Sequence, residues 1–184
     1  MKTKGIAFLQ YKAQLTHVFG EERWNDFFEM LKTSNPYFTQ AILATTQVPV
    51  DEFISFIDAM VKEYYNGDEK IIWRFGRQVA KYSLSEKGPF YAFIRSKREP
   101  EAFISKILHR IWSMYYDEGR AKNELEGNIM HAYILDLPKY YRYIEYSVMG
   151  FIQQAIELIG VLVKETVKVK SSAREIHYKF VLEL

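Results

Sequence analysis

The sequence predicts an α+β domain in which a helical N-terminal half precedes a four-stranded antiparallel sheet. Apolar residues of the first half recur at three- and four-residue spacing, as they do along the buried face of an amphipathic helix. The C-terminal segment alternates apolar and polar residues, which is typical of half-buried strands. Two more extended segments and a long helical one lie between them, so the order is strand, strand, helix, strand, strand. Helices gathered on one side of an antiparallel sheet define this fold class.

The N-terminal half, residues 1–100, is predicted to be helical, with breaks at glycine, asparagine and proline. Gly20, Ser34-Asn35-Pro36, Asn66-Gly67 and Lys87-Gly88-Pro89 are the breaks, and Ser96-Lys97-Arg98-Glu99-Pro100 is a charged turn. The predicted helices span residues 5–19, 21–31, 51–65, 68–82 and 90–95. Residues 37–49 are irregular and rich in threonine, and we interpret them as a loop with an extended stretch.

The second part, residues 101–184, begins with a regular helix and continues as sheet. Apolar residues fill one face of the helix over 101–112. The period then changes, and Met114-Tyr115-Tyr116 is predicted to open a strand that turns at Glu126-Gly127-Asn128 into a second strand, 129–137. A long helix is expected over 140–162, and the alternating segments on either side of Ser171-Ser172-Ala173 predict a terminal hairpin.

Length and composition indicate one folded domain and exclude several classes of function. The 184 residues fit a single domain over 1–184, and 48% hydrophobic residues are enough for a core. The net charge of +2, with signs interspersed, lacks the basic stripe of a nucleic-acid binder. The absence of cysteine is consistent with a cytoplasmic protein, and no apolar run approaches the roughly 20 residues that cross a bilayer.

Aromatic residues make up 16% of the chain and have two interpretations. They can form an aromatic-rich core, because these side chains bury large areas. Alternatively, they can line a pocket for a flat apolar ligand. We favour the core.

No sequence motif for catalysis or for a metal site is found. The 9 glycines are scattered singly, so no phosphate-binding loop is formed, and Gly-x-Ser-x-Gly is absent. The four histidines are far apart and show no metal-ligand spacing. We therefore predict a protein that is not an enzyme.

His109 is the one histidine with two distinct interpretations. It falls nearly opposite the apolar stripe of the helix 101–112, where it is either exposed to solvent or faces a second cavity in which a neutral imidazole could ligate a metal or haem iron. His131 is expected to be partly buried on its strand. His17 and His177 are expected at the surface.

Two stretches of sequence carry a resemblance to a known family. The first runs from Lys4-Gly5-Ile6-Ala7-Phe8 to Phe19-Gly20-Glu21-Glu22-Arg23-Trp24, and the second is Leu108-His109 followed by Tyr115-Tyr116. With the order of elements, they resemble the haem nitric-oxide/oxygen binding (H-NOX) domain and its haem-free bacterial relatives over nearly the whole chain. The resemblance implies one H-NOX-like ligand-binding or sensor domain, with a signal helix and the sheet in residues 101–184.

The family's cofactor residues are only partly matched here. His109 corresponds to the proximal haem ligand, whereas the Tyr-x-Ser-x-Arg motif that holds the haem propionates would fall on Tyr133-Ile134-Leu135-Asp136-Leu137, where only Tyr133 remains. Loss of the arginine removes the bidentate partner of a carboxylate. The run from Trp112 to Gly119 resembles one in the haem-free relatives. We therefore expect no cofactor, with haem as the alternative.

Three functional hypotheses follow from the sequence and the resemblance. The first is a non-catalytic sensor in bacterial signalling, with an apolar and aromatic pocket for a small ligand between the helical and sheet-bearing halves. The second is a divergent haem-based sensor of NO or O2, with His109 as the axial ligand. The third is a protein–protein interaction module without a small ligand, which uses exposed segments such as Tyr140-Tyr141-Arg142-Tyr143. A signalling protein partner and a homodimer remain open in all three.

Overall fold

The computed structural model describes residues 1–95, 100–106 and 108–183, and these divide into two compact units. Unit 1 contains residues 1–71 and 115–117, and unit 2 contains residues 72–114 and 118–184. The division after Ile71 groups the helices of residues 72–95 with the sheet, whereas the sequence analysis placed the helical part over residues 1–100. The predicted charged turn, Ser96 to Glu99, lies outside the described residues.

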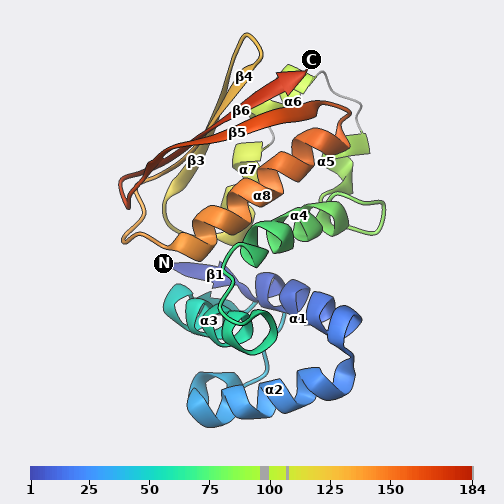
Figure 1. Cartoon of the computed structure of the whole chain (residues 1–184), viewed down its shortest axis with the longest axis vertical. Coiled ribbons are helices and arrows are strands. Elements are labelled where there is room, and N and C mark those ends of the chain that lie inside the picture. Colours follow the sequence, from blue (N-terminus) through green and yellow to red (C-terminus); the bar gives the residue numbers. More distant parts are fainter. Residues whose placement is uncertain (96–99, 107, 184) are drawn as a thin grey trace. The chain divides into compact units, whose positions relative to one another are not determined.

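Unit 1 consists of helices and one very short sheet (Figure 1). Its elements are β1 (Lys2–Lys4), α1 (Gly5–Phe19), α2 (Glu21–Ser34), the 3-10 helix η1 (Pro36–Thr39), β2 (Gln47–Pro49) and α3 (Val50–Tyr65). The strands β1 and β2 pair antiparallel, so the extended stretch predicted within 37–49 is present, and its partner lies at the N-terminus. Asn66 ends α3 in the left-handed conformation, as a helix C-terminus often requires.

The core of unit 1 is a cluster of aromatic rings that contact one another. Phe8 and Phe56 lie with ring centroids 4.8 Å apart, and Phe8 meets Trp24 edge-on at 6.0 Å. Tyr11 packs against Phe53 at 5.7 Å. All five side chains are buried. In this unit the aromatic residues therefore form a core, which is the interpretation that the sequence favoured.

Unit 2 contains a four-stranded antiparallel sheet and the remaining helices (Figure 1). Its elements are α4 (Ile71–Ser83, whose first residue is assigned to unit 1), α5 (Tyr91–Arg95), α6 (Pro100–Lys106), α7 (Leu108–Tyr115, whose last residue is likewise assigned to unit 1), β3 (Arg120–Glu126), β4 (Ile129–Leu135), α8 (Arg142–Leu158), β5 (Leu162–Ser171) and β6 (Glu175–Glu183). The strand order is β3-β4-β6-β5. The predicted fold class and the order strand, strand, helix, strand, strand are confirmed.

The prediction of a strand at Met114-Tyr115-Tyr116 is wrong. Met114 and Tyr115 belong to α7, and Tyr116 forms an isolated antiparallel bridge with Thr3. The buried residues Leu108, Ile111 and Tyr115 are spaced by three and four, so the helical period in fact continues to the end of α7. Packing of these residues in the core overrides the strand preference of tyrosine.

The two faces of the sheet differ because side chains alternate along each strand. The inner face carries buried residues such as Ala132, Ile134 and Phe180, and α8 lies along it (Figure 1). The opposite face, called the outer face below, carries His131, Tyr133 and His177. The edge strand β5 is largely exposed, and its pairing with β6 shifts register twice.

The helices α4 and α8 cross at two glycines that allow their backbones to touch. A Cβ atom on Gly76 would lie 2.0 Å from the carbonyl oxygen of Ser147, and one on Gly150 would lie 2.2 Å from that of Trp73. Only glycine permits so close an approach. The crossing fixes the position of α8, which supplies several of the polar residues described next.

Candidate functional site

His109 lies in the first turn of α7 and is half-buried. Its neighbours on the helix, Leu108, Ile111 and Trp112, are buried and anchor α7 in the core. The imidazole is therefore held on a well-packed helix and is neither fully exposed nor fully enclosed.

Tyr133 lies on β4 and is half-buried on the outer face of the sheet. It is directly opposite His177 on β6, and the two rings stack with centroids 4.3 Å apart. On the other side, the ammonium of Lys122 lies 5.8 Å from the tyrosine ring. Burial, and after it the carboxylate of Glu124, raises the pKa of Tyr133.

His131 and His177 form a hydrogen-bonded pair on the same face. Nδ1 of His131 lies 3.0 Å from Nε2 of His177, and the rings are nearly parallel. The prediction that His177 lies on the surface is wrong, because its side chain is buried among its neighbours. His131 is partly buried and bonded to a neighbour, as expected.

The structure brings Tyr133 together with His131 and His177, and not with His109. Between the described residues of α7 and β4, no hydrogen bond or ring contact joins His109 to Tyr133. Their side chains come from different elements, and Tyr133 points to the face of the sheet opposite the core.

Glu145 on α8 forms a polar centre that the sequence analysis did not single out. Its carboxylate is fully buried. It accepts hydrogen bonds from the hydroxyl groups of Tyr178 (2.5 Å), Tyr140 (2.7 Å) and Ser171 (3.0 Å). It also forms an ion pair with Lys168 (2.6 Å). Burial alone would raise the pKa of Glu145, but the hydrogen bonds, led by that from Lys168, outweigh it and hold the pKa below its usual value. Burial, and after it the hydrogen bond to Glu145, raises the pKa of Tyr140 to about 12.

A signal for this centre was present in the sequence. Glu145 follows Ile144 within the apolar pattern of the helix, at a position one residue from the buried stripe. An acid so close to a buried stripe requires partners. Three of the four partners, Lys168, Ser171 and Tyr178, come from β5 and β6, and the register that brings them near cannot be inferred from a helix pattern.

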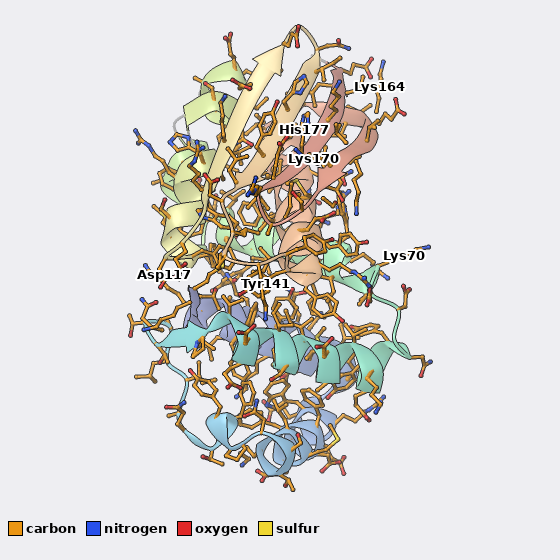
Figure 2. All side chains as sticks on the ribbon, turned by 90° about the vertical axis from the view of Figure 1, so that its left-hand side faces the viewer. Lys70, Asp117, Tyr141, Lys164, Lys170 and His177 are labelled. Atoms are coloured by element: carbon orange, nitrogen blue, oxygen red, sulfur yellow. The ribbon has the colours of Figure 1, made fainter. Side chains whose placement is uncertain are left out.

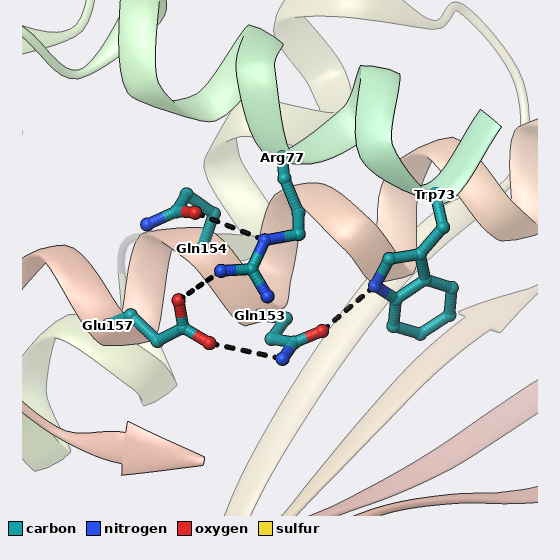
Figure 3. Close-up of polar contacts among 5 residues, drawn as sticks. All are labelled: Trp73, Arg77, Gln153, Gln154 and Glu157. Carbon is teal, nitrogen blue, oxygen red and sulfur yellow. Dashed lines mark hydrogen bonds and ion pairs between the residues drawn. The ribbon is translucent and has the colours of Figure 1, made fainter. Parts of the chain in front are cut away.

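A second polar network connects α4 and α8 (Figure 3). Arg77 donates to Oε1 of Gln154 (3.1 Å) and to Glu157 (2.5 Å), while the indole N–H of Trp73 donates to Gln153 (2.8 Å). The network lies beside the glycine crossing of the same helices. It joins side chains of α4 to side chains of α8, so we interpret it as structural.

No cluster of three or more histidine or acidic side chains in the described ranges could hold a metal ion. No helix among the described residues is both long and apolar enough to cross a membrane.

The segment Tyr133–Leu137 does not fit the carboxylates of a haem. Beyond the Tyr133 hydroxyl, its side chains are apolar except for Asp136. Asp136 is a carboxylate itself and pairs with Arg120 at 3.0 Å, with both groups largely exposed. The segment contains no cationic side chain that could pair with the two haem propionates, and the carboxylate of Asp136 would repel them. On the iron side, an imidazole such as that of His109 is a suitable ligand.

The comparisons with known proteins rest on structure alone. No family model and no curated protein matches the sequence. An H-NOX protein from S. oneidensis in the Fe(II)NO ligation state has a TM-score of 0.72 and 11% identity, over 98% of this chain and 99% of that chain. The Fe(II) unliganded H-NOX protein from K. algicida has a TM-score of 0.70 and 12% identity, over 98% and 97%. A mutant H-NOX domain from Shewanella oneidensis in the Fe(II)CO ligation state has a TM-score of 0.73 and 11% identity, over 97% and 98%.

These neighbours cover nearly all of both chains, so the likeness extends to the whole arrangement of helices and sheet and is not limited to one motif. At 11–12% identity it establishes the fold and leaves the function to the residues of this chain. The fold predicted from the sequence resemblance is confirmed: this chain has an H-NOX-like α+β fold.

Proposed function

We propose that this protein is a non-catalytic sensor domain that binds a small apolar ligand without haem. The observation that carries the proposal is the combination of an H-NOX-like fold with a segment, Tyr133–Leu137, that contains no cationic residue to pair with propionates. The phenol that remains there, Tyr133, is stacked on His177 on the outer face of the sheet. Both facts favour a ligand other than haem.

The test begins with the purified protein and two measurements. Native mass spectrometry detects an organic molecule that purifies with the chain, and a titration with indole, followed by amide chemical shifts, detects a site for an apolar probe. A retained mass, or shifts that saturate and map to one group of residues, supports the proposal. The proposal is overturned if no organic molecule purifies with the protein and the amide shifts do not saturate with indole.

The second candidate function is haem-based sensing of a diatomic gas, with His109 as the axial ligand. It is favoured by the position of His109, which is half-buried in the first turn of a helix that buries Leu108, Ile111 and Trp112. Two of the similar H-NOX structures, both from S. oneidensis, are in Fe(II)NO and Fe(II)CO ligation states. In this reading the carboxylates of haem need partners outside residues 133–137.

An absorption spectrum distinguishes the two functions. The protein is measured as purified and again after haemin is added and the excess removed. A sharp Soret band that is lost in His109→Ala and retained in His17→Ala, a substitution at an exposed position of α1, establishes the second function and refutes the first. No band in either sample refutes the second.

The third hypothesis, an interaction module that uses Tyr140 to Tyr143, receives little support. Tyr141 and Tyr143 are buried, and Tyr140, which is exposed at 37%, donates to the buried Glu145. These residues lead into and begin α8 as part of the packed core, so we do not propose them as a docking surface.

A further inference from the structure

His131 and His177 occupy the two central strands of the sheet and touch in one specific way. His131 is opposite Lys179 in the register of β4 and β6, so His177 is its diagonal neighbour, two residues along. Diagonal neighbours on an antiparallel pair come within reach only through long or aromatic side chains. Here Nδ1 of His131 meets Nε2 of His177 at 3.0 Å, with ring centroids 5.2 Å apart.

This contact limits how many protons the two rings can hold. A nitrogen–nitrogen hydrogen bond requires one N–H donor and one lone pair. It persists when both rings are neutral and when one is protonated. When both are protonated the lone pair is gone, and two cations face each other at hydrogen-bond distance.

The charged groups around the pair nearly cancel one another. From β3, Glu124 lies opposite His131, and Lys122 pairs with Glu124 at 2.6 Å. From β5, Lys170 lies opposite His177 and pairs with Glu175 of β6 at 2.7 Å (Figure 2 shows Lys170 and His177 close together).

Two unbalanced groups remain near the histidines, one of each sign. Lys179 of β6 lies opposite His131. Glu126 of β3 lies 3.6 Å from the other ring nitrogen of His131, and its side chain is 87% exposed, so solvent screens it. Tyr133, stacked on His177, is the remaining titratable neighbour on β4. With these charges in balance, the shared hydrogen bond and the mutual repulsion decide how the pair titrates.

We propose that His131 and His177 act as one proton-sensitive unit on the outer face of β4 and β6. The two rings stay in contact while the pair carries at most one extra proton, and they separate when a second proton binds. Burial, and after it the neighbouring His131, lowers the pKa of His177, which agrees with the geometry. The contact between the two rings needs no haem or other ligand, although His177 also stacks on Tyr133, a residue considered for the cofactor.

The expected functional result is a sheet that responds to mild acidification. Histidine is the side chain whose charge ordinarily changes between about pH 5 and pH 8. When the second proton enters, the rings lose their contact and Tyr133 loses a stacked partner. Separation therefore alters the environment of the two central strands while the inner face, with its apolar core, stays packed.

The test is a titration of the histidine Cε1–H resonances by NMR, from about pH 8 to about pH 5. In the wild type, we expect His131 and His177 to show two coupled midpoints separated by about one unit or more, each visible in both resonances. In His177→Gln, whose amide can keep a hydrogen bond at the Nε2 position, His131 should titrate once. His131→Asn makes the same test from the other side.

Internal controls are available in the same spectra. His17 is exposed on α1, which belongs to unit 1 and not to the sheet-bearing unit 2, so its resonances should be the same in every variant. Amide shifts of Tyr133 and Lys179 should follow the second midpoint in the wild type and not in the double variant His131→Asn/His177→Gln. Amide dispersion at neutral pH checks that each variant is folded. Independent single midpoints for His131 and His177 in the wild type would overturn the proposal, and this outcome does not require a folded variant.

Discussion

Replacing Glu145 with glutamine should destabilise the protein by an amount that can be worked out from its four contacts. The carboxylate is fully buried, and it receives three hydroxyl donors and the ammonium of Lys168. A hydrogen bond to a charged group contributes about 1.5–3 kcal/mol and one between neutral groups about 0.5–1.5 kcal/mol, so the loss of charge weakens each contact by about 1 kcal/mol.

Two effects offset part of this loss. Glutamine has nearly the same shape, so the hydroxyl groups keep a partner, and burying a neutral amide costs less than burying a carboxylate. Lys168, at 42% exposed, regains water when the ion pair is lost. We therefore expect a net loss of about 2–3 kcal/mol, which corresponds to a fall in Tm of about 4–12 °C for a chain of this size.

The assay is urea unfolding at neutral pH, followed by circular dichroism, with Glu175→Gln as the matched control. Glu175 also pairs with a lysine of β5, Lys170 at 2.7 Å, but this pair is half-exposed and its loss should cost about 1 kcal/mol or less. If Glu145→Gln is as stable as Glu175→Gln, the reasoning is refuted.

The pH dependence gives a second check on the same residue. Because the pKa of Glu145 is lowered in the folded state, its contribution is complete above the usual glutamate value of about 4.5 and is lost as the pH falls through the lowered pKa. The difference in stability between wild type and Glu145→Gln should therefore shrink on acidification. A constant difference would mean that the carboxylate charge is not the cause.

Three further predictions concern packing and protonation. Gly150→Ala places a Cβ atom 2.2 Å from a backbone oxygen of Trp73, so we expect a loss of about 3 kcal/mol or more in thermal melts, whereas Gln153→Ala on the same helix should cost about 1 kcal/mol. Asn123 is buried, and its amide has no hydrogen-bond partner among the described residues. Asn123→Leu should therefore raise the free energy of unfolding by about 1–3 kcal/mol. A lower Tm would indicate a bound water or ligand at this amide. Since the pKa of His177 is lowered in the folded state, its contribution to the free energy of unfolding is complete above about pH 6.5 and is lost as the pH falls to the lowered pKa. This loss should be absent in His177→Gln when stability is measured against pH. An identical pH profile of stability in both proteins would contradict the prediction.

The long, strongly periodic elements could be predicted from the sequence because each carries its own signal. The apolar residues of α3 and α8 recur at helical spacing over four or more turns. The terminal hairpin alternates over both strands, and its turn falls between Ser171 and Glu175 as expected. The resemblance in the opening helices and at Leu108-His109 added the arrangement of these elements, which periodicity alone does not give.

The elements that were missed depend on contacts between distant residues. Strand β1 has three residues and exists because Thr3 is opposite Val48 of β2, a pairing that the N-terminal segment does not reveal by itself. Tyr115 was assigned to a strand from its β-preference, although the core fixes it in a helix.

The candidate site was less predictable than the fold for the same reason. His177 lies on the polar side of an alternating strand, which predicts exposure, and it is buried only because the register of β4 and β6 places Tyr133 and His131 against it. Glu145 likewise depends on donors from β5 and β6. A single sequence contains the residues of such clusters but not the strand register that assembles them.

The division of the aromatic residues between the two compact units has a practical consequence for spectroscopy. Trp24 is enclosed by the phenylalanine rings of unit 1, whereas Trp73 and Trp112 belong to unit 2. A protein that keeps only Trp24 would report by fluorescence on unit 1, and one that keeps only Trp112 would report on unit 2. Each unit thus carries its own built-in optical probe, and the order in which the two lose their structure can be followed without any added label.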